Sequence, residues 1–233
     1  MLMICGFVLT GCGPVAMNAN KSLDEKQVPP PSKTDIPSPE TYRVKMETSE
    51  GDVIIEVTRA WAPKGADRFY TLVKNHYYDG CRFFRVMPGF MAQVGINGDP
   101  HVNAEWKDAN ISDDPVKESN IRGTVTFANS GPHSRSTQFF INFGDSSFLD
   151  KKGFPPFGRV VEGMDHVDSI YPGYREKPNQ GKITDSGNKY LSENFPQLDY
   201  IIKATIISED NKEVSVKTGS ETKSSAQKTA AKK

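Results

Sequence analysis

Cysteine is scarce in this chain of 233 residues, which has three: Cys5, Cys12 and Cys81. Two of them fall within the first dozen residues, so no pair is left for a disulfide in the folded part of the chain. The cysteine count therefore does not show the redox compartment. We interpret Cys81 as a buried thiol, because no His/Asp arrangement that would support a reactive role stands near it in the sequence.

The chain also has no net charge, and its histidines are not spaced as metal ligands are. Lys and Arg number 29 and Asp and Glu number 29, so the chain has no basic footprint for nucleic acid. The histidines are scattered rather than spaced as ligands, and we predict no metal site and no cofactor. Hydrophobic residues make up 36% of the chain, which indicates that part of it lies outside a core.

The apolar run at the start of the chain, residues 2–9, is too short to span a bilayer but suits the apolar region of a signal peptide. It ends in Leu9-Thr10-Gly11-Cys12, which resembles a bacterial lipobox, in which the cysteine is lipidated. We predict a signal peptide over residues 1–12, lipidation at Cys12 and, because Gly13 follows, export to the outer membrane. No Lys or Arg precedes the run, so a cytoplasmic chain without a signal remains the alternative.

Composition divides the rest of the chain into three parts. Residues 13–40 are rich in Pro, Ser, Asn, Lys and Asp, which predicts a disordered, extended tether. Residues 41–208 form the predicted folded domain. In residues 209–233 Ser, Thr, Lys and Ala dominate, which predicts a disordered, mildly basic tail.

Alternating apolar residues within the folded part predict many short strands. A helix is predicted from Pro63, where a proline suits the first turn, and two shorter helices near residues 164–170 and 188–195. Residues 96–120 are polar and predict a long loop that Trp106 anchors. This pattern indicates a mainly β fold, a closed antiparallel barrel capped by two or three helices. The predicted strands are residues 42–48, 53–57, 83–87, 90–95, 124–128, 137–143, 157–161 and 200–207.

One cation, Arg85, stands inside a run of large apolar residues. On a strand, alternate residues share a face, which puts Phe83, Arg85 and Met87 together; across the Pro88-Gly89 turn, Met91 and Gln93 share a face. An arginine between Phe and Met is costly unless its charge is used. Either Arg85 reaches from a sheet edge to water, or it is a hydrogen-bond donor in the wall of an apolar pocket for a ligand with a carbonyl.

Three motifs, in order, resemble signatures of the cyclophilin family of peptidyl-prolyl cis/trans isomerases. Residues 83–93 resemble F-x-R-x-x-P-G-F-M-x-Q, and residues 157–164 resemble F-G-x-V-x-x-G-M. Residues 127–141 resemble M-A-N-x-G-P…S-Q-F-F-I, with Phe127 for the usual Met and Thr137 for the usual Ser. The resemblance covers about residues 42–208. It implies an eight-stranded barrel and catalysis of rotation about X–Pro peptide bonds.

The resemblance also implies roles for individual residues. Arg85 matches the catalytic donor and Gln93 the amide that orients it. Phe90, Met91, Phe140 and Leu149 match the proline pocket. The complete set of substrate-binding positions that we predict is Phe90, Met91, Ala128, Asn129, Gln138, Phe140, Phe148 and Leu149.

Two departures from the family pattern lie close together. Phe148 stands where eukaryotic members usually have Trp, whose indole helps to hold cyclosporin, so we predict weaker inhibition with isomerisation intact. Those members also carry a pocket histidine shortly afterwards. Here residues 151–156 are one residue longer than the family segment and contain no His; Phe154 is our candidate for that wall of the pocket.

The predicted partners are proline-containing peptides and unfolded exported proteins, with a membrane reached through the lipid on Cys12. We predict a monomer that does not bind nucleic acid, placed in the cell envelope at the periplasmic face of the outer membrane. A module that binds proline-containing segments without turnover, or a chaperone, is the alternative function.

Overall fold

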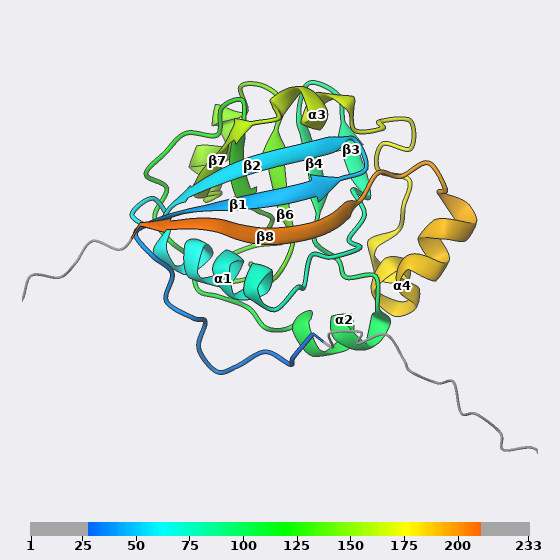
Figure 1. The fold of residues 1–233 in the computed structure, drawn as a ribbon, viewed down its shortest axis with the longest axis horizontal. Helices are drawn as coiled ribbons and strands as arrows, with labels where there is room; N and C mark the ends of the chain where they lie inside the picture. Colours follow the sequence, from blue (N-terminus) through cyan, green and yellow to red (C-terminus); the bar gives the residue numbers. More distant parts are fainter. Residues whose placement is uncertain (1–27, 211–233) are drawn as a thin grey trace, which may run out of the picture.

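The computed structural model describes residues 28–210, and one antiparallel sheet of eight strands dominates them (Figure 1). The strands are β1 (Thr41–Thr48), β2 (Gly51–Thr58), β3 (Arg85–Met87), β4 (Met91–Val94), β5 (Thr124–Phe127), β6 (Phe139–Asn142), β7 (Pro156–Glu162) and β8 (Ile201–Asp210). The helices among these residues are α1 (Pro63–Lys74), α2 (Pro100–Trp106), α3 (Met164–Ser169), α4 (Gln180–Asn194) and the 3-10 helix η1 (Ser147–Lys152). The prediction of a mainly β fold is confirmed.

The strands follow the order β3-β4-β6-β5-β7-β2-β1-β8 in the sheet. Because β3 and β8 stand at opposite ends of this order, the strand pairs do not establish the predicted closed barrel. The chain just before β3 nevertheless reaches the start of β8. Phe83 N donates to Asp199 O at 2.9 Å, and Ile201 N donates to Cys81 O at 2.9 Å. An isolated bridge between Arg82 and Tyr200 therefore joins the two ends of the sheet.

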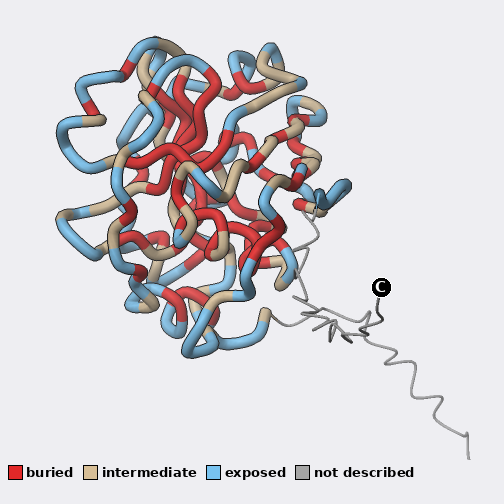
Figure 2. Tube along the Cα trace, turned by 90° about the vertical axis from the view of Figure 1, so that its left-hand side faces the viewer, coloured by how far each residue is buried: buried red, intermediate tan, exposed pale blue. Residues whose placement is uncertain are grey.

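The main core lies inside the curved sheet, where buried residues gather at the centre of the molecule (Figure 2). On β1, the alternate residues Tyr42, Val44 and Met46 are at most 1% exposed, as the strand period requires. Helix α1 covers this core with Phe69, whose ring lies 5.4 Å from that of Phe139. The apolar stripe of α1 confirms the predicted helix.

Strands β3 and β4 divide their side chains between the core and the outer face of the sheet. Val86 and Ala92 enter the main core, while Met91 packs in a separate small cluster. Alternation therefore leaves Arg85 and Gln93 on the outer face with Met91. Phe83 was predicted to share the face of Arg85, but it is buried in the main core, because it precedes β3 and does not continue its alternation.

One helix replaces part of a segment that was predicted as a loop, and another begins earlier than predicted. Helix α2 lies within residues 96–120, where the Asp99 side chain accepts a hydrogen bond from His101 N at 2.8 Å and Pro100 occupies the first turn. This Asp-Pro pair begins a helix rather than a turn. Helix α4 begins at Gln180 and is interrupted by a kink at Gly187; the part after the kink confirms the helix predicted near residues 188–195. Trp106 is 1% exposed, as expected of an anchor.

Residues 28–40 run along α1 and α2 instead of leaving the domain as a free tether (Figure 1). Trp106 Nε1 donates to Pro29 O at 3.0 Å, and Ile36 N donates to Thr71 Oγ1 at 2.8 Å. A proline-rich composition disfavours helix and sheet, but it leaves backbone groups free to bond with a neighbouring surface. We call residues 28–40 the strap.

Asp35 in the strap makes an ion pair with a nearly buried arginine. Arg68 Nε donates to Asp35 Oδ1 at 2.8 Å, and the Arg68 side chain is 6% exposed. We expect Asp35→Ala to lower the free energy of unfolding by about 2 kcal/mol, because a buried charge loses its partner. Urea denaturation checks this, with Lys33→Ala, an exposed strap position, as the control. Equal stability of the two variants would contradict the role of the strap.

Residues 1–27 and 211–233 lie outside the described residues. They include the predicted signal peptide, Cys12, half of the predicted tether and nearly all of the predicted tail. Within residues 28–210 no helix has both the length and the hydropathy to cross a membrane.

Candidate active site

Three predicted site residues, from two separate motifs, lie in one row across the sheet. Arg85 on β3 is paired in register with Gln93 on β4, and Gln93 is paired with Phe140 on β6. Paired residues of neighbouring antiparallel strands place their side chains on the same face. The sheet therefore brings the cation, the amide and an aromatic ring together on its outer face.

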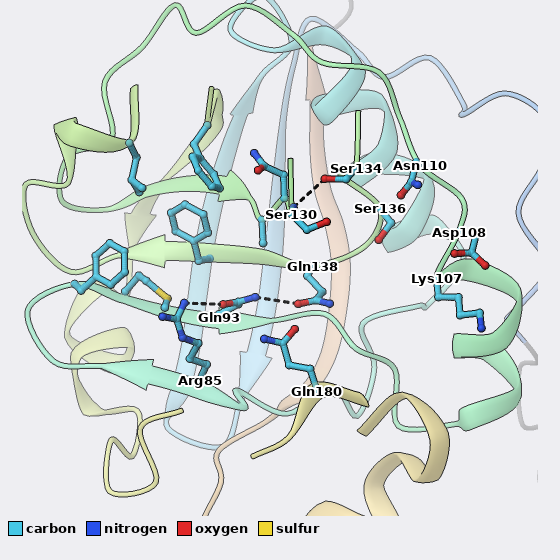
Figure 3. Close-up of a pocket in the computed structure, with 17 residues that line it drawn as sticks. Arg85, Gln93, Lys107, Asp108, Asn110, Ser130, Ser134, Ser136, Gln138 and Gln180 are labelled. Atoms are coloured by element: carbon cyan, nitrogen blue, oxygen red, sulfur yellow. Dashed lines mark hydrogen bonds between the residues drawn. The ribbon is translucent and has the colours of Figure 1, made fainter. Parts of the chain in front are cut away.

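The guanidinium of Arg85 is held by partners on two sides. Nη1 donates to Gln93 Oε1 at 3.4 Å, and Nε and Nη2 donate to Glu176 Oε2 at 3.2 and 3.1 Å. Gln93 in turn donates from Nε2 to Gln138 Oε1 at 2.9 Å (Figure 3). The Arg85 side chain is 31% exposed, so it borders a cavity rather than filling the core.

The cavity beside Arg85 has a volume of about 520 Å³, within the roughly 300–1,000 Å³ of small-ligand pockets. One part is apolar: Met91, Phe140 and Leu149 form a buried cluster, against which Phe90, Ala128 and Phe154 pack. An apolar surface beside a fixed guanidinium suits a compact apolar group that carries a carbonyl. The residues of this part that line the cavity are Phe90, Met91, Ala128, Phe140, Leu149 and Phe154.

The other part of the cavity is polar and comes from loops and from the ends of helices. The predicted residues Asn129 and Gln138 lie there. The remaining polar lining residues were missed by sequence reasoning, because they lie outside the motifs or, for the three serines, at positions between the matched motif residues. They are Lys107, Asp108, Asn110, Ser130, Ser134, Ser136 and Gln180 (Figure 3).

The structure gathers all predicted site residues except two around this cavity. Phe148 is 52% exposed and is not among the lining residues; its ring lies 5.8 Å from that of Phe90, at the rim. Cys12 lies outside the described residues. Phe154 does line the cavity, with its ring 6.0 Å from that of Phe140. The roles of these residues in catalysis remain predictions.

A buried amide, Asn120, holds the segment that carries Leu149 and Phe154. Its side chain is 0% exposed and donates from Nδ2 to Asp150 Oδ1 at 2.7 Å and to Phe154 O at 2.8 Å. Asn120 Oδ1 accepts from Thr126 Oγ1 at 2.8 Å. This side chain thus connects β5 to the 3-10 helix η1, and no sequence motif pointed to it.

The carboxylate of Asp150 is the acceptor at the centre of this connection. Burial opposes its charged form, but hydrogen bonds from Ser119 and Asn120 outweigh burial and lower the pKa of Asp150. A carboxyl group whose pKa is lowered by folding stabilises the fold at neutral pH. That contribution is lost as the pH falls through the folded-state pKa.

Cys81 is 0% exposed, and burial raises the pKa of its thiol. This agrees with its interpretation as a buried thiol. Among residues 28–210 no group of three His, Cys, Asp or Glu side chains is placed to hold a metal ion.

The apolar cluster and the guanidinium of Arg85 together suit a ligand that has a compact apolar group and a carbonyl. A sequence profile described as "Cyclophilin type peptidyl-prolyl cis-trans isomerase/CLD" matches residues 43–188. The chain belongs to the cyclophilin-type peptidyl-prolyl cis-trans isomerase family.

Individual relatives agree with the profile. A "Probable peptidyl-prolyl cis-trans isomerase" of Brucella abortus is 40% identical over 141 residues, 56% of this chain and 71% of the relative. A "Peptidyl-prolyl cis-trans isomerase" of Acinetobacter baylyi is 38% identical over 133 residues, covering 54% and 70%. The human "Peptidyl-prolyl cis-trans isomerase-like 3" is 36% identical over 133 residues, covering 54% and 80%.

Solved structures show the same fold. A cyclophilin-type isomerase of Cryptosporidium parvum superimposes with a TM-score of 0.53 at 20% identity, covering 73% of this chain and 99% of that chain. A cyclophilin of Hirschia baltica has the same TM-score and identity and covers 73% and 75%.

Phe148 leads to a prediction about inhibition. Because its ring carries no N–H, we expect Phe148→Trp to tighten cyclosporin binding by about tenfold, the value of one added hydrogen bond of ~1.4 kcal/mol. Isothermal titration calorimetry of both proteins checks this, and the isomerase rate should stay the same. Unchanged affinity would show that position 148 does not limit binding.

Proposed function

We propose that this chain catalyses cis/trans rotation about X–Pro peptide bonds in the cavity beside Arg85. The observation that carries the proposal is the pairing of Arg85 with Gln93 at the edge of an apolar cluster. The family to which the chain belongs and the names of its relatives support the same reaction.

The reaction sets modest chemical requirements. Resonance in the X–Pro amide creates a barrier of roughly 18–20 kcal/mol, so uncatalysed exchange takes tens of seconds or longer. In the twisted transition state this resonance is lost, and the proline nitrogen gains a lone pair. No bond is made or broken. A catalyst therefore has to favour the twisted state over both planar states.

The residues of the site meet these requirements. The apolar cluster of Met91, Phe140 and Leu149 receives the proline ring and keeps water from it. Arg85 donates to the substrate carbonyl and lies ready for the developing lone pair on the nitrogen. Its guanidinium stays charged and presents donors in a rigid plane, which the ammonium of lysine does not. Gln93 holds that plane from the cavity side.

The test is isomerisation of a short X–Pro peptide by the full chain, followed through its cis and trans signals in NMR exchange spectra. Faster exchange than in buffer alone is the expected result. A folded protein that binds the peptide without accelerating exchange would overturn the proposal and support the alternative, a module that binds proline-containing segments. A binding module has no need of an arginine held by three hydrogen bonds.

We further propose that the enzyme works in the cell envelope on unfolded exported proteins. The apolar run of residues 2–9 and the lipobox-like sequence that ends at Cys12 support this. A lipid anchor contributes ~0.8 kcal/mol per buried methylene. The full chain should incorporate labelled palmitate and sediment with membranes, and Cys12→Ser should do neither. Labelling that is equal in both would overturn the anchor.

The finer features of the fold are also proposals. Backbone hydrogen bonds from Phe83 to Asp199 and from Ile201 to Cys81 support a barrel that is closed at its ends. We propose a monomer, for which a single species of about 26 kDa in light scattering is the expected result.

A further inference from the structure

Glu176 lies on the chain between α3 and α4 and contacts the candidate catalytic arginine, although it does not line the cavity. Its Oε2 accepts from both Nε and Nη2 of Arg85, at 3.2 and 3.1 Å. These two atoms form one edge of the guanidinium plane. Gln93 occupies the Nη1 corner, so the plane is held at two separate places.

Some N–H donors of Arg85 bond to protein residues, and the others are available to a substrate. A guanidinium has five N–H donors. Glu176 accepts from Nε and Nη2, and Gln93 accepts from Nη1. One further N–H remains on Nη1 and one on Nη2, and these two are free for the carbonyl and the nitrogen of a substrate. The ion pair leaves the outer end of the guanidinium available while it restricts rotation of the plane.

The backbone beside Glu176 is attached to the strand that carries Arg85. Arg175 O accepts from Val86 N at 3.1 Å, so neighbours of both ion-pair partners are bonded to each other. Arg175 has φ of 52°, a left-handed conformation that is uncommon for a residue other than glycine. The loop therefore turns sharply next to Glu176 and is tied to the edge of β3.

The same loop is also anchored on its other side. The ring of Tyr174 lies 5.2 Å from that of Tyr171 and 5.1 Å from that of Phe195, which follows α4. Packing at Tyr174 and the backbone bond at Arg175 hold the chain directly before Glu176. Its carboxylate needs no rearrangement to meet Arg85.

We propose that Glu176 is a positioning residue that orients the guanidinium of Arg85 for isomerisation. This inference rests on the proposed function. Arg85 is 31% exposed, and a long side chain at that exposure has several rotamers open to it. Only one orientation places the two remaining N–H groups at the bond that rotates. Glu176 selects that orientation before the substrate arrives.

An ordinary surface ion pair would account for the distances but not for a catalytic effect. The side chains are 31% and 62% exposed, and pairs with such exposure contribute little to stability. Removal of Glu176 should therefore leave the melting temperature unchanged. A change in turnover without a change in stability separates orientation from structural support.

The experiment compares the full-length wild type with Glu176→Ala, Glu176→Gln and Glu193→Gln, in which an exposed carboxylate on α4 is the control. We expect kcat to fall about tenfold in Glu176→Ala and less in Glu176→Gln, which keeps an acceptor oxygen. KM should change less than twofold, because the apolar cluster binds the ring. Glu193→Gln should match the wild type. Wild-type kcat in Glu176→Ala would overturn the inference.

A double-mutant cycle tests whether Glu176 acts through Arg85. In an Arg85→Ala background, Glu176→Ala should cause no further loss, because residues that act as one unit are not additive. A second tenfold loss in that background would show an independent effect and overturn the positioning role.

A spectroscopic measurement separates this inference from the proposed function. The ¹⁵N–¹H signal of Arg85 Nε, identified by its loss in Arg85→Ala, should be sharp in the wild type and shifted and broadened in Glu176→Ala. If the wild type fails to catalyse isomerisation but this signal behaves as expected, the proposed function fails while the positioning of Arg85 by Glu176 stands. An unchanged signal overturns the inference itself.

Discussion

Arg85→Ala is expected to lower kcat/KM for isomerisation of an X–Pro peptide by about 10²–10³-fold. This corresponds to ~2.7–4 kcal/mol, the usual cost of removing one preorganised donor from an active site. The loss should fall mainly on kcat, because the apolar cluster that we propose binds the proline ring is left intact. NMR exchange spectra of wild type and variant at equal concentration make the comparison.

The fold should survive this substitution, since Arg85 is on the outer face of the sheet and outside the core. Arg159→Ala is the matched control: its side chain is 57% exposed, and it does not line the cavity. It should retain wild-type activity. Arg85→Lys is a second probe that keeps the charge but loses the planar donor set, and it should recover little of the rate. An unfolded Arg85→Ala would instead point to a structural role.

Asn120→Ala is expected to lower the free energy of unfolding by about 3 kcal/mol and to lower activity in the protein that remains folded. The substitution removes the side chain that donates to Asp150 and to Phe154 O and accepts from Thr126. Asp150 keeps other donors, but each buried polar group left without a partner costs ~1–3 kcal/mol. Activity should fall because Leu149 and Phe154 are no longer held at the cavity.

Urea denaturation and peptide isomerisation, measured on the same preparation, check this prediction. Asn194→Ala, at an exposed position near the end of α4, serves as the control and should change neither quantity by much. Activity should be compared well below the unfolding transition of the variant. Full activity there would mean that the segment from Ser146 to Phe154 keeps its place without Asn120.

The effect of Asn120→Ala should also depend on pH. In the wild type, the lowered pKa of Asp150 stabilises the fold at neutral pH and does so less as the pH falls through that pKa. The variant lacks the hydrogen bond from Asn120 Nδ2, one of those that favour the charged carboxylate, while the bonds from the backbone N–H of residue 120 and from Ser119 Oγ remain. The stability difference between the two proteins should therefore shrink in acid.

The sequence by itself determined the features of this structure that depend on residues close together in the chain. The strand period put Arg85 with Met87 and Met91 with Gln93, and the sheet has both pairs so, although Phe83 left the predicted face. A proline at the first turn and an apolar stripe were enough to predict helix α1. The motifs supplied the family, and nine of the residues they pointed to surround one cavity. Period and propensity act over a few residues, which is why sequence alone sufficed for these features.

Other features depended on contacts between residues far apart in the chain. Arg85 and Glu176 are separated by 91 positions, and Asn120 and Asp150 by 30. A polar residue in a loop gives no local sign of which partner it will meet, because that partner is set by the path of the whole chain. The tertiary structure alone therefore decided what holds Arg85, what holds the cavity wall, and where the strap lies.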